Sequence, residues 1–179
     1  LDSKEWGRLT VGQQSSVYYD VVGAKTDVWD DDMLAQGPGN GINGDYDGSY
    51  RSRKMLKYKK SVDQVDVYAS FLFADSSYYP GNGLAYKRQG GGSLGADYHI
   101  TKDLTWGTAW HYTKASLRDP STGEGRDYHQ TLFGTALSWP PDNWVLSAGR
   151  GFYETCLLPK RPNLTDYFAG AAWGSASVP

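Results

Sequence analysis

Strict alternation of apolar and polar side chains is the feature of this sequence that most limits its fold. It is clearest from Leu104 to Thr113, where Leu, Trp, Thr, Trp and Tyr alternate with Thr, Gly, Ala, His and Thr. Successive side chains of a β-strand point to opposite faces, so a period of two indicates a strand with one apolar face. The same pattern recurs along most of the chain, which predicts an all-β fold.

Eight segments carry this alternation, and the connections between them alternate in length. Short connections lie near residues 63, 102 and 142, and long ones span 15–48, 75–92, 114–127 and 153–164. Aromatic residues gather beside the short turns, as at Trp106, Trp139 and Trp144. Short turns on one side, long loops on the other and aromatic residues at strand ends are typical of outer-membrane barrels. The expected fold class is therefore an antiparallel transmembrane β-barrel with about eight strands present.

Composition excludes several other classes. Leucine and isoleucine are scarce while 15% of the residues are aromatic and 22 are glycine, which argues against a helical bundle. The formal net charge of −2 argues against nucleic acid as a partner. The sequence contains no apolar run of the length that a membrane-spanning helix needs.

Neither a cofactor nor a metal site is expected. Cys156 is the single cysteine and the three histidines are scattered, so neither an internal disulfide nor a zinc framework can form. The motifs of hydrolases and phosphate-binding loops are also missing, and we expect no enzymatic activity. The first five residues are neither basic nor followed by an apolar run, which favours a mature form or an internal fragment.

A long polar excursion between two strands is the segment with the clearest functional signal. Residues 13–48 show no strand or helix period, and loops of this length in compact domains tend to be functional or disordered. The excursion carries Asp27, Asp30, Asp31 and Asp32, and the strand after it, residues 49–58, is strongly basic. We interpret the acidic loop and the basic strand as the two walls of a charged constriction.

The residues around this excursion resemble those of a known family. Trp6-Gly7-Arg8-Leu9-Thr10-Val11-Gly12-Gln13, Val17-Tyr18-Tyr19-Asp20-Val21-Val22-Gly23 and Gly48-Ser49-Tyr50-Arg51-Ser52 resemble the general diffusion porins of Gram-negative outer membranes, and Asn143-Trp144-Val145-Leu146-Ser147-Ala148-Gly149 is similar to a later strand of that family. The resemblance implies the fifth to twelfth strands of a sixteen-stranded trimeric barrel, with residues 13–48 as the loop that folds into the pore.

Three departures from the family favour the interpretation that residues 1–179 are an internal segment of a longer porin. Half of the expected strands are present, and the chain ends in Gly174-Ser175-Ala176-Ser177-Val178-Pro179 instead of an aromatic residue. The family's acidic loop motif is replaced by Trp29-Asp30-Asp31-Asp32. A closed eight-stranded barrel would leave no lumen for the long loop, because its interior is just filled by side chains.

The resemblance assigns the pore constriction to specific residues. Asp27 matches the first acidic position of the family's loop, and one of the three adjacent aspartates, with Asp31 favoured by spacing, matches the second. On the basic wall, alternation places Arg51, Arg53 and Lys57 on one strand face, and Arg8 is a further candidate. A solvated surface loop and a calcium site are the alternatives for the aspartates. His99 and His111, on polar faces of neighbouring strands, are expected to line the lumen.

These observations predict a Gram-negative outer-membrane porin for passive diffusion of small hydrophilic solutes and ions. Its expected partners are outer-membrane lipid, two further copies in a homotrimer, and the solutes themselves. A secreted carbohydrate-binding β-sandwich is the alternative, because exposed Trp and Tyr side chains also stack on sugars. The strand positions of Trp110 and Trp173 favour aromatic girdles over a sugar site.

Overall fold

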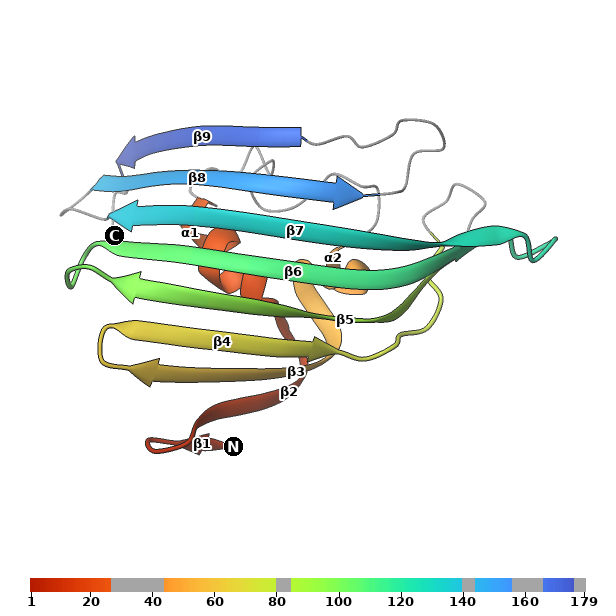
Figure 1. Cartoon of the computed structure of the whole chain (residues 1–179), viewed down its shortest axis with the longest axis horizontal. Coiled ribbons are helices and arrows are strands. Elements are labelled where there is room, and N and C mark those ends of the chain that lie inside the picture. The colour runs from red at the N-terminus through yellow and green to blue at the C-terminus, as the bar shows by residue number, and fades with distance from the viewer. Residues whose placement is uncertain (27–43, 80–84, 140–143, 156–165, 176–179) are drawn as a thin grey trace.

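Nine β-strands form a single antiparallel sheet in the computed structural model, which describes residues 1–26, 44–79, 85–139, 144–155 and 166–175. Each strand pairs with its neighbour in sequence, so the sheet is a meander (Figure 1). The strands are β1 (Asp2–Ser3), β2 (Gly7–Ser15), β3 (Arg51–Val62), β4 (Val65–Leu72), β5 (Ala85–His99), β6 (Thr105–Arg118), β7 (Gly125–Trp139), β8 (Trp144–Thr155) and β9 (Asp166–Ser175). Between β2 and β3 lie the π-helix η1 (Tyr19–Gly23) and the helices α1 (Ala24–Thr26) and α2 (Gly44–Asp47).

This topology confirms the expected all-β, antiparallel fold class. β2 to β9 correspond to the eight segments that the alternation predicts, and β1 adds only two residues. Within the described ranges the strands belong to one sheet rather than to two stacked sheets. The two-layer sandwich of the carbohydrate-binding alternative is therefore not found in that part of the chain.

Several strands extend further toward the long connections than the alternation predicts. β5 begins at Ala85 although a loop is expected as far as residue 92, and β6 pairs with β7 out to Arg118, opposite Gly125. Backbone hydrogen bonds continue where the side chains no longer alternate in polarity, as in Lys87-Arg88-Gln89. A polarity pattern cannot detect such extensions, because the ladder itself does not depend on side-chain type.

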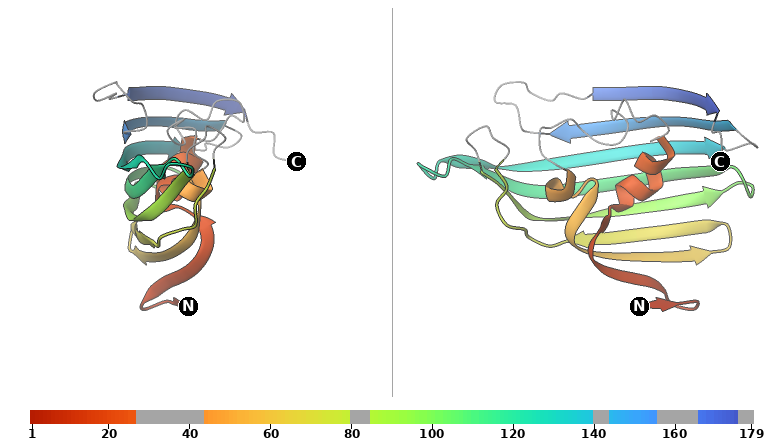
Figure 2. Two further views of the ribbon diagram at one scale, coloured as in Figure 1. Left: turned by 90° about the vertical axis from the view of Figure 1, so that its right-hand side faces the viewer. Right: turned by 180° about the vertical axis from the view of Figure 1, so that it is seen from behind.

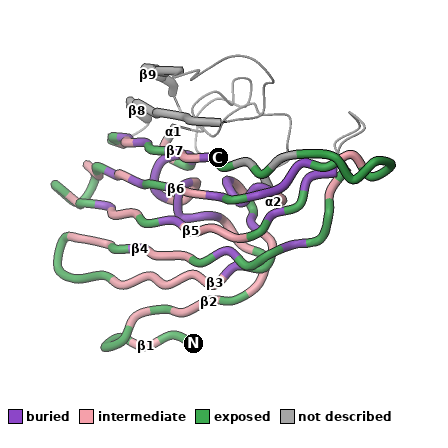
Figure 3. The backbone as a smooth tube through the Cα atoms, turned by 45° about the vertical axis from the view of Figure 1, so that its right-hand side comes forward, coloured by how far each residue is buried: buried purple, intermediate pink, exposed green. Residues whose placement is uncertain are grey.

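One face of the sheet, the outer face, carries a continuous apolar surface. The register places one row of side chains next to each other on consecutive strands: Leu9, Tyr58, Ala69, Leu94, Trp110 and Phe133. Leu94 is 57% exposed, Phe71 54% and Trp106 49%. Along β6, buried positions alternate with partly or fully exposed ones from Gly107 to Ala115, as a sheet covered on one side requires (Figure 3). The outer face therefore exposes large apolar and aromatic side chains that the described residues leave uncovered.

The opposite, inner face is covered by the helical segment that follows β2. Seen from behind, η1, α1 and α2 all lie against this side of the sheet (Figure 2). Val17, Tyr18, Val21 and Val22 are at most 2% exposed, and their core partners on the sheet are Tyr68, Ala109, Leu132 and Ala136. Burying each apolar side chain of this size contributes roughly 1.5–3 kcal/mol, which holds a helical segment too short to be stable alone.

Local hydrogen bonds turn the chain from β2 into this segment. The Ser16 hydroxyl accepts a hydrogen bond from the Tyr19 N–H at 3.0 Å and donates one to the Ser49 carbonyl at 2.6 Å. Ser16 thus ends β2, starts the helical turn and ties both to the approach of β3. The described part of the excursion contains helical turns of three to five residues, although the sequence shows no helix period there. Turns this short do not produce a detectable period.

Glycines on the inner face allow the close approach of this segment. A Cβ added at Gly95 would lie 2.8 Å from Val17 Cγ1, and one at Gly134 would lie 2.8 Å from Tyr18 Oη. Both distances are shorter than carbon atoms tolerate, so larger residues at these positions would force the segment away from the sheet. Packing against the helical segment therefore explains Gly95 of β5 and Gly134 of β7.

A β-bulge interrupts the alternation expected along β3. Gly12 pairs with Met55 but Gln14 pairs with Ser52, so Arg53 and Lys54 together oppose one residue of β2. Lys54 has a φ of 50°, which costs about 1–2 kcal/mol for a non-glycine residue. Ser52 and Met55 are both fully buried. The expectation that one uninterrupted face carries Arg51, Arg53 and Lys57 is therefore wrong.

Replacing Gly107 with valine tests the docking of the helical segment. An added Cβ at Gly107 would lie 2.7 Å from Asp97 Oδ1 and 3.0 Å from Lys25 Nζ, and it would also meet the Val21 carbonyl. We expect Gly107→Val to lower the free energy of unfolding by about 1–3 kcal/mol and to increase hydrogen exchange at residues 17–23. Ala96→Val, on the outer face, is the control. Unchanged exchange in Gly107→Val would contradict the docking.

Candidate functional site

Two ion pairs fasten the helical segment to the inner face of the sheet. Lys57 Nζ lies 2.6 Å from Asp20 Oδ2, and Lys25 Nζ lies 2.6 Å from Asp97 Oδ1. Each lysine also donates a hydrogen bond to the backbone, Lys57 to the Ser15 carbonyl at 2.9 Å and Lys25 to the Val21 carbonyl at 2.8 Å. The side chains of Lys25 and Asp97 are only 12% and 8% exposed. At this burial, solvent screens the attraction much less than at a surface.

Charged and polar groups continue across the neighbouring strands β3, β4 and β5. Lys59 Nζ lies 2.8 Å from Asp66 Oδ2 and 4.9 Å from the centroid of the Tyr68 ring. The Tyr68 hydroxyl donates a hydrogen bond to Asp97 Oδ2 at 3.0 Å. Cations and carboxylates therefore alternate over the inner face, which gives it a local field without a large net charge.

A cleft of about 480 Å³ lies between the helical segment and strands β2 to β4. Side chains of both signs and several hydrogen-bonding groups line it: Arg8, Thr10, Gln14, Asp20, Ala24, Lys57, Lys59 and Tyr68. Seven of these eight side chains carry a charged or hydrogen-bonding group, which suits hydrated ions and hydrophilic solutes better than apolar ligands.

A second cluster holds α2 against the ends of β3, β4 and β5. The Arg88 side chain is fully buried and donates to the carbonyls of Phe73 at 3.1 Å, Tyr46 at 2.9 Å and Arg53. The Tyr46 ring stacks on Tyr78 at 4.2 Å between centroids, and the Arg53 guanidinium lies 5.0 Å from its centre. One buried arginine thus joins the end of the excursion, at Tyr46, to β3 and to the end of β4.

Asp75 supplies negative charge to this cluster. Its carboxylate lies 2.9 Å from Lys54 Nζ, 3.6 Å from Arg53 Nε and 3.9 Å from the Arg88 guanidinium. Burial alone would raise the pKa of this carboxyl, but Lys54, the Ser76 N–H and Arg53 outweigh it and lower the pKa below its ordinary value. Asp75 is therefore ionised in the folded protein near neutral pH.

The two histidines expected in the lumen have different surroundings. His111 is fully buried beneath α2, with Nδ1 2.7 Å from the Ser93 hydroxyl and Nε2 2.8 Å from the Thr113 hydroxyl. His99 lies near the short-turn end, with Nε2 3.5 Å from Asp66 Oδ2. His111 is thus part of the packing under α2 rather than a residue exposed to a lumen.

The residues predicted for the constriction have separate outcomes. Asp27, Asp30, Asp31 and Asp32 lie outside the described residues. Lys57 lines the cleft together with Arg8. Arg53 contacts the α2 cluster instead, and Arg51 is exposed with its guanidinium 5.9 Å from the Tyr50 ring centre. The role of all these residues in a constriction stays a prediction.

Sequence reasoning missed most of the residues that form the network. Asp20, Lys25, Lys59, Asp66, Tyr68, Arg88 and Asp97 were not selected. Asp66, Tyr68 and Asp97 do lie on the polar sides of their alternating segments, so the alternation carried a signal for them. Lys25 and Arg88 had none, because only the folded chain brings them to their partners.

The described residues contain no cluster of three or more His, Cys, Asp or Glu side chains arranged to hold a metal ion. Among the same residues, no helix has the length and apolarity needed to cross a membrane.

Comparison with solved structures aligns the chain with Ail, the attachment invasion locus protein of Yersinia pestis, at a TM-score of 0.33. The alignment has 17% identity and covers 66% of this chain and 79% of that chain. No known family model matches the sequence, and no curated protein matches it either. So distant a likeness carries no argument, and the functional interpretation rests on the geometry of the two faces.

A double-mutant cycle measures the anchoring ion pair of Lys25 and Asp97. We expect Lys25→Met and Asp97→Asn to show a coupling free energy of about 2 kcal/mol, because both groups are buried and share a hydrogen-bond network. Lys102 and Asp103, 3.8 Å apart with side chains 90% and 49% exposed, provide the control pair. Their coupling should be near zero, as for most exposed pairs. Equal couplings would show that burial does not strengthen the anchor.

The lowered pKa of Asp75 predicts a pH-dependent stability. The contribution of its carboxylate is complete above the unfolded-state pKa of about 3.9 and is lost as the pH falls through the lower folded-state value. Urea unfolding at pH 6 and pH 3 should therefore show a loss of stability on acidification that is smaller in Asp75→Asn. An identical pH dependence in the two proteins would contradict this assignment.

Proposed function

We propose that this chain is a segment of a Gram-negative outer-membrane porin, a water-filled channel for passive diffusion of small hydrophilic solutes and ions. One observation carries the proposal, namely the opposite character of the two sheet faces. The outer face exposes large apolar and aromatic side chains, while the inner face carries ion pairs and a cleft beneath a folded-back segment. That is the arrangement of a barrel wall between lipid and water.

The exposed outer side chains support a lipid environment. In water, a surface that includes Phe71, Leu94, Trp106, Trp110 and Phe133 at 40–57% exposure would lose the stabilisation of apolar burial. Contiguous apolar surface of this kind marks contact with a membrane or another protein. Trp106 and Trp139, next to short connections, fit an aromatic girdle at one membrane boundary.

The inner face supports filtration as the mechanism. In the proposed channel, Asp27 and Asp30–Asp32 on the loop face a basic wall that includes Lys57 and Arg8. Arg51 and Arg53, beyond the bulge of β3, are further candidates for this wall. Opposed walls of opposite charge impose a transverse field that orients dipolar solutes and selects ions by charge. The 2.6 Å contact of Lys57 with Asp20 supports an acidic segment opposite a basic strand in this region.

The remaining assignments follow from the same proposal. The protein would lie in the outer membrane, contact lipid with its apolar face and assemble as a homotrimer of sixteen-stranded barrels that this chain partly supplies. Solutes and ions would pass without a bond being made or broken, so the proposal needs no cofactor and includes no enzymatic activity. Nucleic acid is no partner in this scheme.

The carbohydrate-binding β-sandwich remains the alternative to be tested. It would place exposed aromatic side chains on a sugar-binding face of a two-layer fold. The single sheet of the described residues argues against it. Planar-bilayer recordings of the full-length protein separate the two: stepwise conductance supports the channel, and silent bilayers combined with tight oligosaccharide binding in detergent-free buffer support the alternative.

Selectivity measurements test the acidic wall. We expect Asp31→Asn in the full-length protein to shift the reversal potential in a salt gradient toward anions, because one fixed negative charge is removed from the passage. Asp103→Asn, in an exposed short turn, makes the same charge change and should leave the reversal potential unchanged. An unaltered reversal potential in Asp31→Asn would remove this residue from the constriction.

A further inference from the structure

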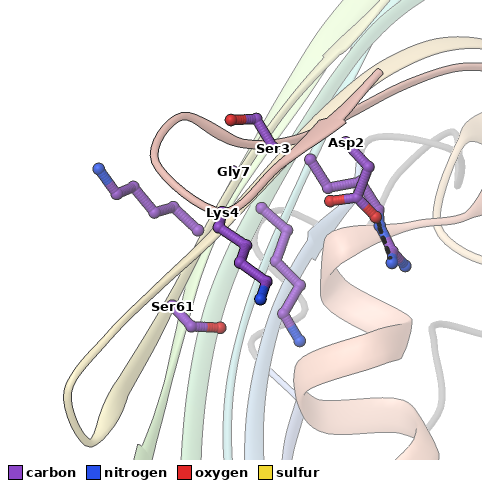
Figure 4. Close-up of a pocket in the computed structure, with 8 residues that line it drawn as sticks. Asp2, Ser3, Lys4, Gly7 and Ser61 are labelled. Atoms are coloured by element: carbon purple, nitrogen blue, oxygen red, sulfur yellow. Dashed lines mark hydrogen bonds and ion pairs between the residues drawn. The ribbon is translucent and has the colours of Figure 1, made fainter.

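A second pocket, of about 330 Å³, lies at the short-turn end of the sheet, where the β1–β2 turn meets β3 (Figure 4). Four of the eight residues that line it are cationic and one is acidic: Asp2, Ser3, Lys4, Gly7, Arg8, Lys59, Lys60 and Ser61. Lys4 and Ser61 project to the same side of the strands in this view. The pocket therefore combines several positive charges with two hydroxyl groups.

The backbone at Gly7 shapes this pocket. Gly7 has a φ of 82°, and a Cβ there would lie 3.1 Å from Lys60 Cβ and would also meet the Lys59 carbonyl. Only glycine allows the chain to reverse so closely against β3. The reversal brings Lys4 from the turn to the same pocket as Lys59 and Lys60 from β3.

Two of the four cations that line the pocket have a carboxylate partner, Arg8 with Asp2 and Lys59 with Asp66 at 2.8 Å. Arg8 contacts Asp2 at 2.6 Å, but both side chains are 62% exposed. An exposed pair of this kind contributes little, so the guanidinium can turn toward a more highly charged anion at small cost. Within the described part of the chain, no carboxylate forms an ion pair with Lys4 or Lys60.

The pocket shares two lining residues with the cleft under the helical segment. Arg8 and Lys59 line both. Across the two, five lining residues are cationic and two are acidic: Lys4, Arg8, Lys57, Lys59 and Lys60 against Asp2 and Asp20. Asp66, which forms an ion pair with Lys59, adds a third carboxylate beside the lining. The excess of positive charge runs from beneath the helical segment to the short-turn end.

The geometry points to an oxyanion-binding site in this pocket, for the phosphate or sulfate group of a solute. Lys4, Arg8 and Lys59 supply charge-assisted hydrogen bonds to the anion, and the Ser61 hydroxyl supplies a neutral donor. Ammonium, guanidinium and hydroxyl groups gathered in one polar pocket match the several acceptor oxygens of a tetrahedral oxyanion. The site itself does not require a channel, and only the route by which a solute reaches it rests on the proposed function.

Titration of the full-length protein in detergent with pyrophosphate tests this site. We expect saturable binding by isothermal calorimetry, weakened at least tenfold in Lys4→Gln/Arg8→Gln, because each lost charge-assisted contact weakens binding by about that factor. Lys102→Gln, a 90% exposed lysine of another short turn, removes one charge elsewhere and should bind like the wild type. Far-UV circular dichroism checks folding, and Lys4→Gln alone tests the site if the double variant misfolds.

Two results would overturn the site: no saturable binding by the wild type at millimolar pyrophosphate, or equal binding by the wild type and Lys4→Gln/Arg8→Gln. Bilayer recordings of the same preparations keep the two proposals apart. Conductance without pyrophosphate binding overturns only the oxyanion site, and binding without conductance overturns only the channel.

Nanodiscs identify the source of the anion. Equal pyrophosphate affinity in discs of zwitterionic lipid and of phosphatidylglycerol supports a dissolved solute as the ligand. Loss of pyrophosphate binding in phosphatidylglycerol discs alone supports an oxyanion site that a lipid headgroup occupies.

Discussion

Every feature of this protein depends on the alternation of side chains along paired strands. In a meander, each strand that is not at an edge of the sheet forms its backbone hydrogen bonds with its two neighbours, whatever side chains project from it. The two faces are therefore free to differ, and here they differ sharply. Apolar and aromatic residues form rows on one face, while charged groups, small residues and the helical segment occupy the other. A sheet of this kind is suited to separate two media.

The inner face is more than a polar surface, because a segment of the chain is built onto it. Four buried apolar residues hold the segment, and two ion pairs add to this hold, through Asp20 among them and through Lys25 after them. Glycines beneath it remove the side chains that would otherwise keep it at a distance. Apolar packing gives this segment its affinity for the sheet, and the short ion pairs fix its register on the strands.

The general architecture could be predicted from the sequence because it depends on polarity alone. Period two in segments such as 104–113 indicates strands, and short and long connections in turn indicate hairpins between them. The sequence also predicts which face of β6 is apolar, since Trp106, Trp110 and Tyr112 share one face. These signals are local and repeat along the chain, so single exceptions do not disturb them.

The details of the site could not be predicted, because they depend on particular long-range contacts. The bulge at Lys54 reverses the alternation between Ser52 and Met55, and no glycine or proline marks it. Lys54 contacts Asp75, 21 residues further along the chain, and this contact accompanies the unusual backbone conformation of Lys54. In the sequence, Arg88 is likewise indistinguishable from a surface arginine, because only the folded chain brings its three carbonyl partners together.

The most direct test of the two-faced sheet is spin labelling along β4 in the full-length protein reconstituted in lipid. Single nitroxides at residues 66 to 71 report accessibility to oxygen, which concentrates in the bilayer, and to a water-soluble nickel complex. The account predicts oxygen maxima at Val67, Ala69 and Phe71, with nickel accessibility never highest there. Nickel maxima at these three positions, or no period of two, would contradict a lipid-facing outer surface.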